Sequence, residues 1–123
     1  ALHYSGVNNS WIDSRELITT LDNNQPLKVD FEATNKAIIE KLKNIEMAIL
    51  PGFIARTQSG YASTLGRGGS DYTSAIIAGA LNADCLAIWS EAEGMYTSDP
   101  RLVEGAYSID ELSYEEAMEL SYF

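Results

Sequence analysis

The spacing of apolar residues changes from a strand period to a helical period in the first third of the chain. Ser10–Asp13 and Leu27–Phe31 are short strand candidates, the second because apolar and polar residues alternate in it. Between them, Asp22–Pro26 is a cluster of turn-forming residues. From Glu32 to Asn44 the apolar residues recur at the spacing of one helix face, at Ile38, Leu42 and Ile45.

Two further apolar runs are short and continuous, which is typical of strands buried on both faces. Met47–Leu50 ends at the breaker pair Pro51-Gly52, and Cys85–Ser90 follows a segment rich in small residues. A buried run placed after a helix suits a parallel sheet covered on both sides. Between the two runs, Phe53–Leu65 is more polar and is interpreted as a connection with a turn at Gln58–Gly60.

Two more helices are predicted from their first residues. Ser70 is a favourable N-cap for a helix that reaches about Asn82, and Ser113 with Glu116 forms a capping box that opens a final helix. The resulting alternation of strands and helices predicts an α/β protein. Its expected architecture is a three-layer αβα sandwich with a mostly parallel sheet.

Charge and composition exclude several classes of function. The 123 residues include 8 basic and 18 acidic side chains, a formal net charge of −10, which disfavours nucleic acids and anionic membranes as partners. The single cysteine, Cys85, cannot form an internal disulfide, and we expect it to be buried among its apolar neighbours. The first residues do not have the pattern of a signal peptide, and the apolar runs are shorter than a spanning helix needs, so a cytoplasmic location is expected. His3 is the only histidine, which gives no support to a metal cluster, and none is predicted.

The turn Gly66–Gly69 has the composition of an anion-binding site. Glycine allows positive φ and lets a ligand approach the backbone, while the first N–H groups of a helix lack internal partners. Arg67, Ser70 and Asp71 add a guanidinium, a hydroxyl and a carboxylate. The spacing matches neither a P-loop nor a dinucleotide-binding fingerprint. The alternative is a tight connection in which the glycines serve only the geometry.

A second loop, Ser90–Arg101, follows the last predicted strand. Ligands of open α/β sheets bind at the carboxyl ends of strands. Tyr96 could stack on a base, Arg101 could pair with phosphates and Glu91 could accept hydrogen bonds. The alternative is a surface loop without a ligand.

Together the two segments resemble one enzyme family. Ser63–Thr73, with the letters STLGRGGSDYT, is similar to the signature of the aspartokinases, which are amino-acid kinases. Ile88-Trp89 followed by Gly94–Arg101 resembles the nucleotide loop of the same family. Pro51–Ile54 and Glu116–Phe123 match as well, so the resemblance covers most of residues 47–123.

The resemblance implies transfer of the γ-phosphoryl group of ATP, with Mg²⁺, to the β-carboxylate of L-aspartate. It implies that Arg67, Gly68, Gly69 and Ser70 bind the substrate and that Asp71 is catalytic, organising lysines rather than attacking. The expected nucleotide-binding residues are Ser90, Glu91, Tyr96 and Arg101. Phosphoryl transfer depends mainly on positioning and charge neutralisation, which suits such a site. A homo-oligomeric parent protein is also expected.

The chain departs from the family pattern in ways that limit this expectation. Ser90-Glu91 stands where the family usually has Thr-Asp, and the lysine-bearing segments that the family has on either side are absent. Residues 1–123 are therefore interpreted as the C-terminal-side portion of an aspartokinase catalytic domain that is inactive alone. Ala83–Cys85 and Glu119–Phe123 look most like bifunctional aspartokinase–homoserine dehydrogenases. The alternatives are a kinase of glutamate, N-acetylglutamate or a nucleoside monophosphate, and a non-catalytic, self-associating segment.

Overall fold

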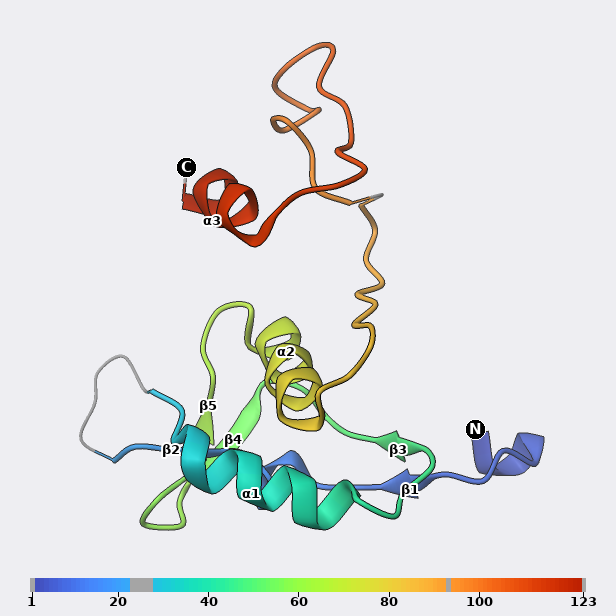
Figure 1. Ribbon diagram of the computed structural model, residues 1–123, viewed down its shortest axis with the longest axis vertical. Helices are drawn as coiled ribbons and strands as arrows, with labels where there is room; N and C mark the ends of the chain where they lie inside the picture. Colours follow the sequence, from blue (N-terminus) through green and yellow to red (C-terminus); the bar gives the residue numbers. More distant parts are fainter. Residues whose placement is uncertain (1, 23–27, 93, 123) are drawn as a thin grey trace. The chain divides into compact units, whose positions relative to one another are not determined.

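The computed structural model describes residues 2–22, 28–92 and 94–122, which form two compact units (Figure 1). Unit 1 comprises Ala1–Ala87 and unit 2 comprises Ile88–Phe123. In chain order, unit 1 contains η1 (Leu2–Ser5), β1 (Ser10–Trp11), η2 (Ser14–Glu16), β2 (Thr19–Thr20), α1 (Phe31–Leu42), β3 (Ala48–Ile49), β4 (Ile54–Thr57), β5 (Ala62–Thr64) and α2 (Gly69–Leu81). Unit 2 contains α3 (Tyr114–Tyr122).

The strands of unit 1 form two small sheets. β1 pairs in parallel with β3, with Ser10 opposite Ala48. In the second sheet β4 is central: it runs parallel to β2 and antiparallel to β5. The α/β class and the parallel strand pairing predicted from the sequence are confirmed. The antiparallel β4–β5 hairpin is new, because its residues fall in the polar stretch that was interpreted as a connection.

Helix α1 covers the sheets with the apolar face that its sequence predicts. Ile38 and Leu42 are buried, and the Asp30 carboxylate caps the helix by accepting the Ala33 N–H at 3.1 Å. Within the helix, buried Thr34 accepts the Thr19 N–H of β2 at 3.1 Å, which ties the helix to the sheet. Helix α2 packs beside α1 and completes the core, whose buried apolar residues are Leu17, Ile18, Val29, Ile38, Leu42, Ala55 and Ile76.

Two strand predictions are wrong. Val29 makes only an isolated antiparallel bridge with Thr20, because Asp30 already caps α1 and the helix begins at Phe31. The beginning of that predicted strand at Leu27, and all but Asp22 of the predicted turn cluster, lie outside the described residues. The apolar run Cys85–Ser90 pairs with no described strand, and Cys85 is exposed rather than buried.

Unit 2 consists of a loop held by antiparallel backbone hydrogen bonds, followed by one helix. Tyr96 bridges Ser108 in antiparallel fashion, and the Ile109 N–H bonds to the Met95 carbonyl at 2.7 Å. The capping box that the sequence predicts is present: the Ser113 N–H bonds to the Glu116 carboxylate at 2.8 Å, and the Glu116 N–H bonds to the Ser113 hydroxyl at 3.2 Å. These bonds to Ser113 hold the pKa of Glu116 below its usual value.

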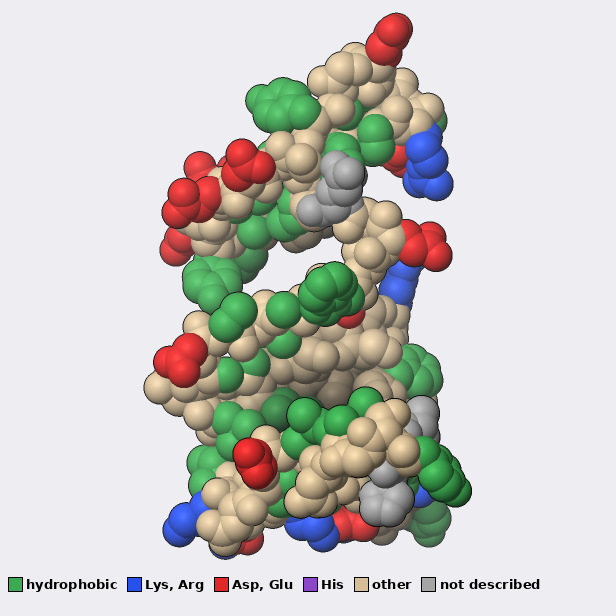
Figure 2. All heavy atoms as spheres, turned by 90° about the vertical axis from the view of Figure 1, so that its right-hand side faces the viewer, with side chains coloured by type: hydrophobic (Ala, Val, Ile, Leu, Met, Phe, Trp, Pro, Cys, Tyr) green, Lys and Arg blue, Asp and Glu red, His purple; other side chains and the backbone are tan. Residues whose placement is uncertain are grey.

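Apolar side chains remain at the surface of both units. Figure 2 shows hydrophobic side chains on one such face, and Leu86, Ile88 and Trp89 are 43%, 55% and 95% exposed. Exposed apolar patches are typical of surfaces that contact other protein segments.

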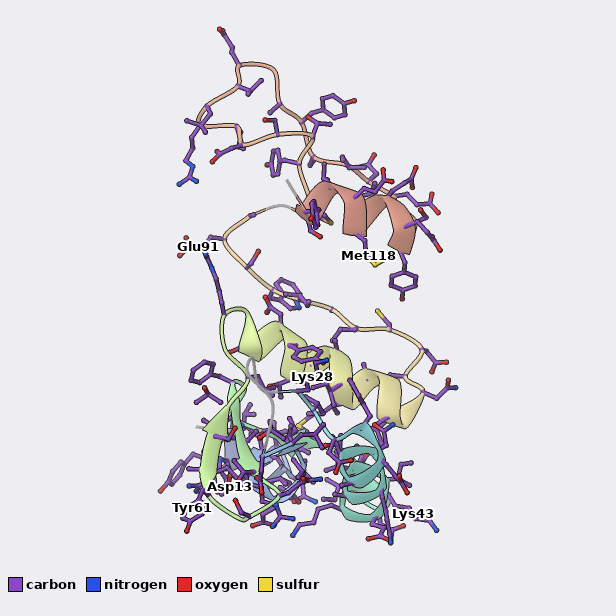
Figure 3. All side chains as sticks on the ribbon, turned by 90° about the vertical axis from the view of Figure 1, so that its left-hand side faces the viewer. Asp13, Lys28, Lys43, Tyr61, Glu91 and Met118 are labelled. Carbon is purple, nitrogen blue, oxygen red and sulfur yellow. The ribbon has the colours of Figure 1, made fainter. Side chains whose placement is uncertain are left out.

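We expect the 123-residue chain to self-associate through this apolar run, because association would remove the run from water. The double change Ile88→Lys and Trp89→Lys should raise the dissociation constant by about tenfold or more in sedimentation experiments. As a control, Tyr61→Lys alters an aromatic residue that projects from the β4–β5 turn (Figure 3) and should have little effect. A monomer over a wide concentration range would contradict the expectation.

Candidate functional site

The glycine-rich turn leads into α2 through two left-handed residues. Gly66 has φ +75° and Gly68 has φ +70°, a region that side-chain-bearing residues rarely adopt. Gly68 is the N-cap of α2, and the cap position makes no side-chain hydrogen bond. The prediction of Ser70 as the N-cap is therefore wrong. Ser70 lies in the first turn of the helix, because the tight turn ends two residues earlier.

The start of α2 presents two backbone N–H groups without partners. The Gly69 N–H bonds to the Gly66 carbonyl and the Tyr72 N–H bonds to the Gly68 carbonyl, both at 3.0 Å. Within the described residues, the N–H groups of Ser70 and Asp71 make no hydrogen bond. Free amides and the positive end of a helix dipole are groups that can bind an anion.

The side chains around these amides are exposed. Arg67, Ser70 and Asp71 are all exposed, whereas Gly69 is buried beneath the turn. Among the residues that the structure describes, the Arg67 guanidinium forms no ion pair. The substrate-binding and catalytic residues predicted from the sequence therefore lie together on one exposed turn. The arginine remains available for an anion.

Residues 51–53 pack closely against the glycine-rich turn and the first turn of α2. A Cβ atom added at Gly52 would lie 2.9 Å from the Ser70 Cα, and one added at Gly69 would lie 2.9 Å from the Phe53 Cδ2. Phe53 itself has φ +75°, which costs a non-glycine residue about 1–3 kcal/mol. Strained backbone of this kind clusters at functional sites, so the loop belongs to the candidate site.

The second group of site residues lies in unit 2, around a cavity of about 580 Å³. Figure 3 shows Glu91 near the beginning of the loop Ser90–Arg101. The cavity is lined by Glu91, Ala92, Tyr96, Asp99, Pro100 and Arg101. Three of the four predicted nucleotide-binding residues are thus brought together. Ser90 is not among the lining residues; its hydroxyl donates to the Ala92 carbonyl at 3.3 Å.

The cavity contains an ion pair that the sequence reasoning missed. The Asp99 carboxylate accepts the Arg101 Nε at 3.0 Å and the Arg101 Nη2 at 2.8 Å, and it also accepts the Arg101 backbone N–H at 2.9 Å. The side-chain bonds of Arg101, followed by its backbone N–H, lower the pKa of Asp99 from 3.8 to about 2. The Asp-Pro-Arg letters could have indicated this pair, since Asp13 and Arg15 show the same spacing and the same contact.

The described residues contain no group of three or more His, Cys, Asp or Glu side chains that could hold a metal ion. Across the same part of the chain, the helices are too short or too polar to cross a membrane.

The whole chain, residues 1–123, matches the amino acid kinase family. It is 39% identical over 120 residues to the lysine-sensitive aspartokinase 3 of Escherichia coli, covering 95% of this chain and 27% of that protein. It is also 39% identical over 110 residues to a bifunctional aspartokinase/homoserine dehydrogenase of Buchnera aphidicola, covering 89% of this chain and 14% of the relative. These two values do not distinguish monofunctional from bifunctional relatives.

The structural comparison agrees with the sequence comparison. The crystal structure of E. coli aspartokinase III in complex with aspartate and ADP superimposes with a TM-score of 0.89 at 37% identity. The match covers 99% of this chain and 28% of that chain. The chain therefore belongs to the amino acid kinase family, and both the α/β sandwich fold and the resemblance to aspartokinases are confirmed. It spans only about a quarter of the length of aspartokinase 3.

The packing of Gly69 predicts opposite effects for two glycine substitutions in α2. Gly69→Ala should destabilise the protein by about 1–3 kcal/mol, because the new Cβ would press on Phe53 and Leu65. Gly79→Ala meets no atom within 4 Å and should stabilise by up to about 1 kcal/mol. Urea unfolding followed by circular dichroism measures both. Equal effects of the two changes would contradict the close contact at Gly69.

The Asp99–Arg101 pair predicts a carboxylate that stays charged in acid. Because the pKa of Asp99 is lowered to about 2, the ion pair should persist as the pH falls and should be lost only when the pH approaches that value. In Arg101→Gln the pKa of Asp99 should rise toward 3.8, since the larger contribution is removed. The measurement is an NMR titration of side-chain carboxyl carbons. Arg15→Gln is the matched control: it should raise the pKa of Asp13 and leave Asp99 unchanged. A wild-type Asp99 that titrates near 3.8 would refute the pair.

Proposed function

We propose that this chain forms two binding segments of an aspartate kinase. The first is the substrate-binding turn Arg67–Asp71, called the substrate seat below, and the second is the nucleotide loop Ser90–Arg101. The single observation that carries the proposal is the start of α2, where Arg67 and the unpaired N–H groups of Ser70 and Asp71 lie on one turn. The relative that was solved with aspartate and ADP supports the choice of substrates. In the proposed reaction, a β-carboxylate oxygen of aspartate attacks the γ-phosphorus of ATP. The bond to the bridging oxygen breaks, and ADP leaves.

The turn supplies the kind of contacts that a dicarboxylic acid needs. The planar guanidinium of Arg67 would bind one carboxylate through two parallel hydrogen bonds. The N–H groups of Ser70 and Asp71, with the backbone of Gly68 and Gly69 at close approach, would hold the other carboxylate. In this proposal Asp71 does not attack. Its carboxylate orients the positive groups that neutralise the transferring phosphoryl group.

The loop of unit 2 would bind the nucleotide. Tyr96 offers an aromatic face, Glu91 offers a hydrogen-bond acceptor, and Arg101 offers charge to the phosphates. Ser90 would contribute its hydroxyl, although it does not line the cavity. Mg²⁺ would be ligated mainly by the phosphates of the nucleotide, since the described residues offer no cluster to hold it.

The proposed activity belongs to a longer protein in which this chain is the C-terminal-side portion of the catalytic domain. The four lysines of the chain, Lys28, Lys36, Lys41 and Lys43, all precede the glycine-rich turn and lie in or near α1. Residues 66–123, which contain both candidate site segments, have no lysine. The proposal therefore assigns the lysines that neutralise the phosphoryl group to other parts of the longer protein, and residues 1–123 alone would be inactive. A homo-oligomeric protein in the cytoplasm is part of the same proposal.

The test is aspartate-dependent ADP formation, measured for the longer protein that carries this chain and for residues 1–123 alone. We expect activity with L-aspartate in the first and none in the second. In the longer protein, Arg67→Gln should lower kcat/KM for aspartate by about 30-fold or more, because a charged contact to the carboxylate is lost. Arg56→Gln removes an exposed arginine of β4 and is the control.

Two outcomes would contradict the proposal. Activity with L-glutamate but not L-aspartate would favour another amino-acid kinase. Equal kcat/KM values for the Arg67→Gln and Arg56→Gln variants would remove the arginine from the substrate seat.

A further inference from the structure

The buried hydroxyl of Thr73 joins the two parts of the substrate seat. Thr73 lies one turn into α2 and is only 3% exposed. Its Oγ1 accepts the Phe53 N–H at 3.0 Å and donates to the Gly69 carbonyl at 2.7 Å. One hydroxyl therefore bonds both to the loop 51–53 and to the first residue of the helix.

The bond to Gly69 alone would be unremarkable. Serine and threonine in helices often donate to the carbonyl four residues earlier. Ser74 does the same, bonding to the Ser70 carbonyl at 3.2 Å, but its hydroxyl has no partner in the loop 51–53. The second bond, from the Phe53 N–H, distinguishes Thr73 from its neighbour.

The residue that Thr73 holds is the strained one. Phe53 has φ +75°, and its carbonyl accepts the Leu65 N–H at 2.8 Å. Both polar groups of the Phe53 backbone are thus fixed, one by α2 and the other by the strand end that leads into the glycine-rich turn. A left-handed non-glycine residue persists only where its surroundings hold it.

Because the loop 51–53 packs closely against the first turn of α2, the bond between Phe53 and Thr73 also restricts the position of that turn. The Phe53 ring lies so near Gly69 that an added Cβ would be 2.9 Å from it, and Gly52 lies equally near Ser70. If the Phe53 backbone relaxed toward negative φ, the loop would move relative to Gly69 and Ser70. The Ser70 and Asp71 amides and Arg67 belong to the turn that rests on this loop.

We propose that Thr73 is a positioning residue: its hydroxyl holds Phe53 against the first turn of α2 and thereby sets the geometry of the carboxylate seat. The proposed role is indirect: Thr73, whose residue is only 3% exposed, acts through Phe53. This inference rests on the proposed function for the identity of the substrate. The contact with Phe53 stands independently of it.

Three variants of the longer protein test the inference. Thr73→Val keeps the shape of the side chain but removes its hydrogen bonds with Phe53 and Gly69, whereas Thr73→Ser keeps both. Ser74→Ala removes the bond from the Ser74 hydroxyl to the Ser70 carbonyl, which is the counterpart of the bond from Thr73 to Gly69. We expect Thr73→Val to raise the KM for aspartate by about tenfold and to change the KM for ATP by less than about twofold. Thr73→Ser should restore wild-type values, and Ser74→Ala should not alter them.

Hydrogen exchange of the peptide that contains Phe53 gives a readout that needs no activity. Thr73→Val should make its exchange about tenfold faster or more, whereas Thr73→Ser and Ser74→Ala should leave it unchanged. Unchanged exchange in Thr73→Val, or equal rises in the KM values for aspartate and ATP, would overturn the inference. If the wild type lacks aspartate-dependent turnover, the proposed function and the substrate assignment fail together. Hydrogen exchange then still decides whether Thr73 holds the loop.

Discussion

The candidate site depends on one contact, the packing of the loop 51–53 against the first turn of α2. Neither Gly52 nor Gly69 leaves room for a side chain at this contact. The Phe53 backbone is held in a left-handed conformation between Thr73 and Leu65. Gly68 caps the helix through its left-handed backbone, and the contact holds the first turn in place. Within the described residues, the Ser70 and Asp71 amides of this turn make no hydrogen bond.

The proposed binding of an anion has to be compatible with a strongly acidic chain. A formal net charge of −10 disfavours anionic polymers, whose binding depends on charge summed over a wide surface. A small carboxylate responds to the nearest groups instead. At the start of α2 these are two backbone amides, the helix dipole and Arg67. The arginine of unit 2 differs from Arg67 in its local charge. Asp99 compensates much of the charge of Arg101 and directs one edge of its guanidinium.

Sequence patterns predicted the parts of the fold that depend on neighbouring residues. The apolar face of α1 and the capping box of α3 follow from spacings within one helix, and both were predicted correctly. The run Cys85–Ser90 was predicted as a strand but is unpaired, because an apolar pattern does not supply the partner. The hairpin β4–β5 was missed because its residues are more polar than those of a buried strand. The N-cap was misplaced because Gly68 takes the cap through its backbone conformation.

The same distinction applies to the site. Motifs predicted Arg67, Ser70 and Asp71 on one turn. They also predicted Ser90, Glu91, Tyr96 and Arg101 at one nucleotide site, and all of these except Ser90 line one cavity. They missed the Asp99–Arg101 pair, which the spacing of the two residues could have indicated. They also missed the bond between Thr73 and Phe53, which are far apart in sequence, and a contact of that kind requires the folded backbone.

The most direct measurement is a structure of the longer protein with L-aspartate bound. The account predicts one carboxylate at about 2.7–3.2 Å from the Ser70 and Asp71 nitrogens and the other on the Arg67 guanidinium. It would be contradicted if aspartate bound elsewhere, or if Arg67 pointed away from the two amides while aspartate was bound.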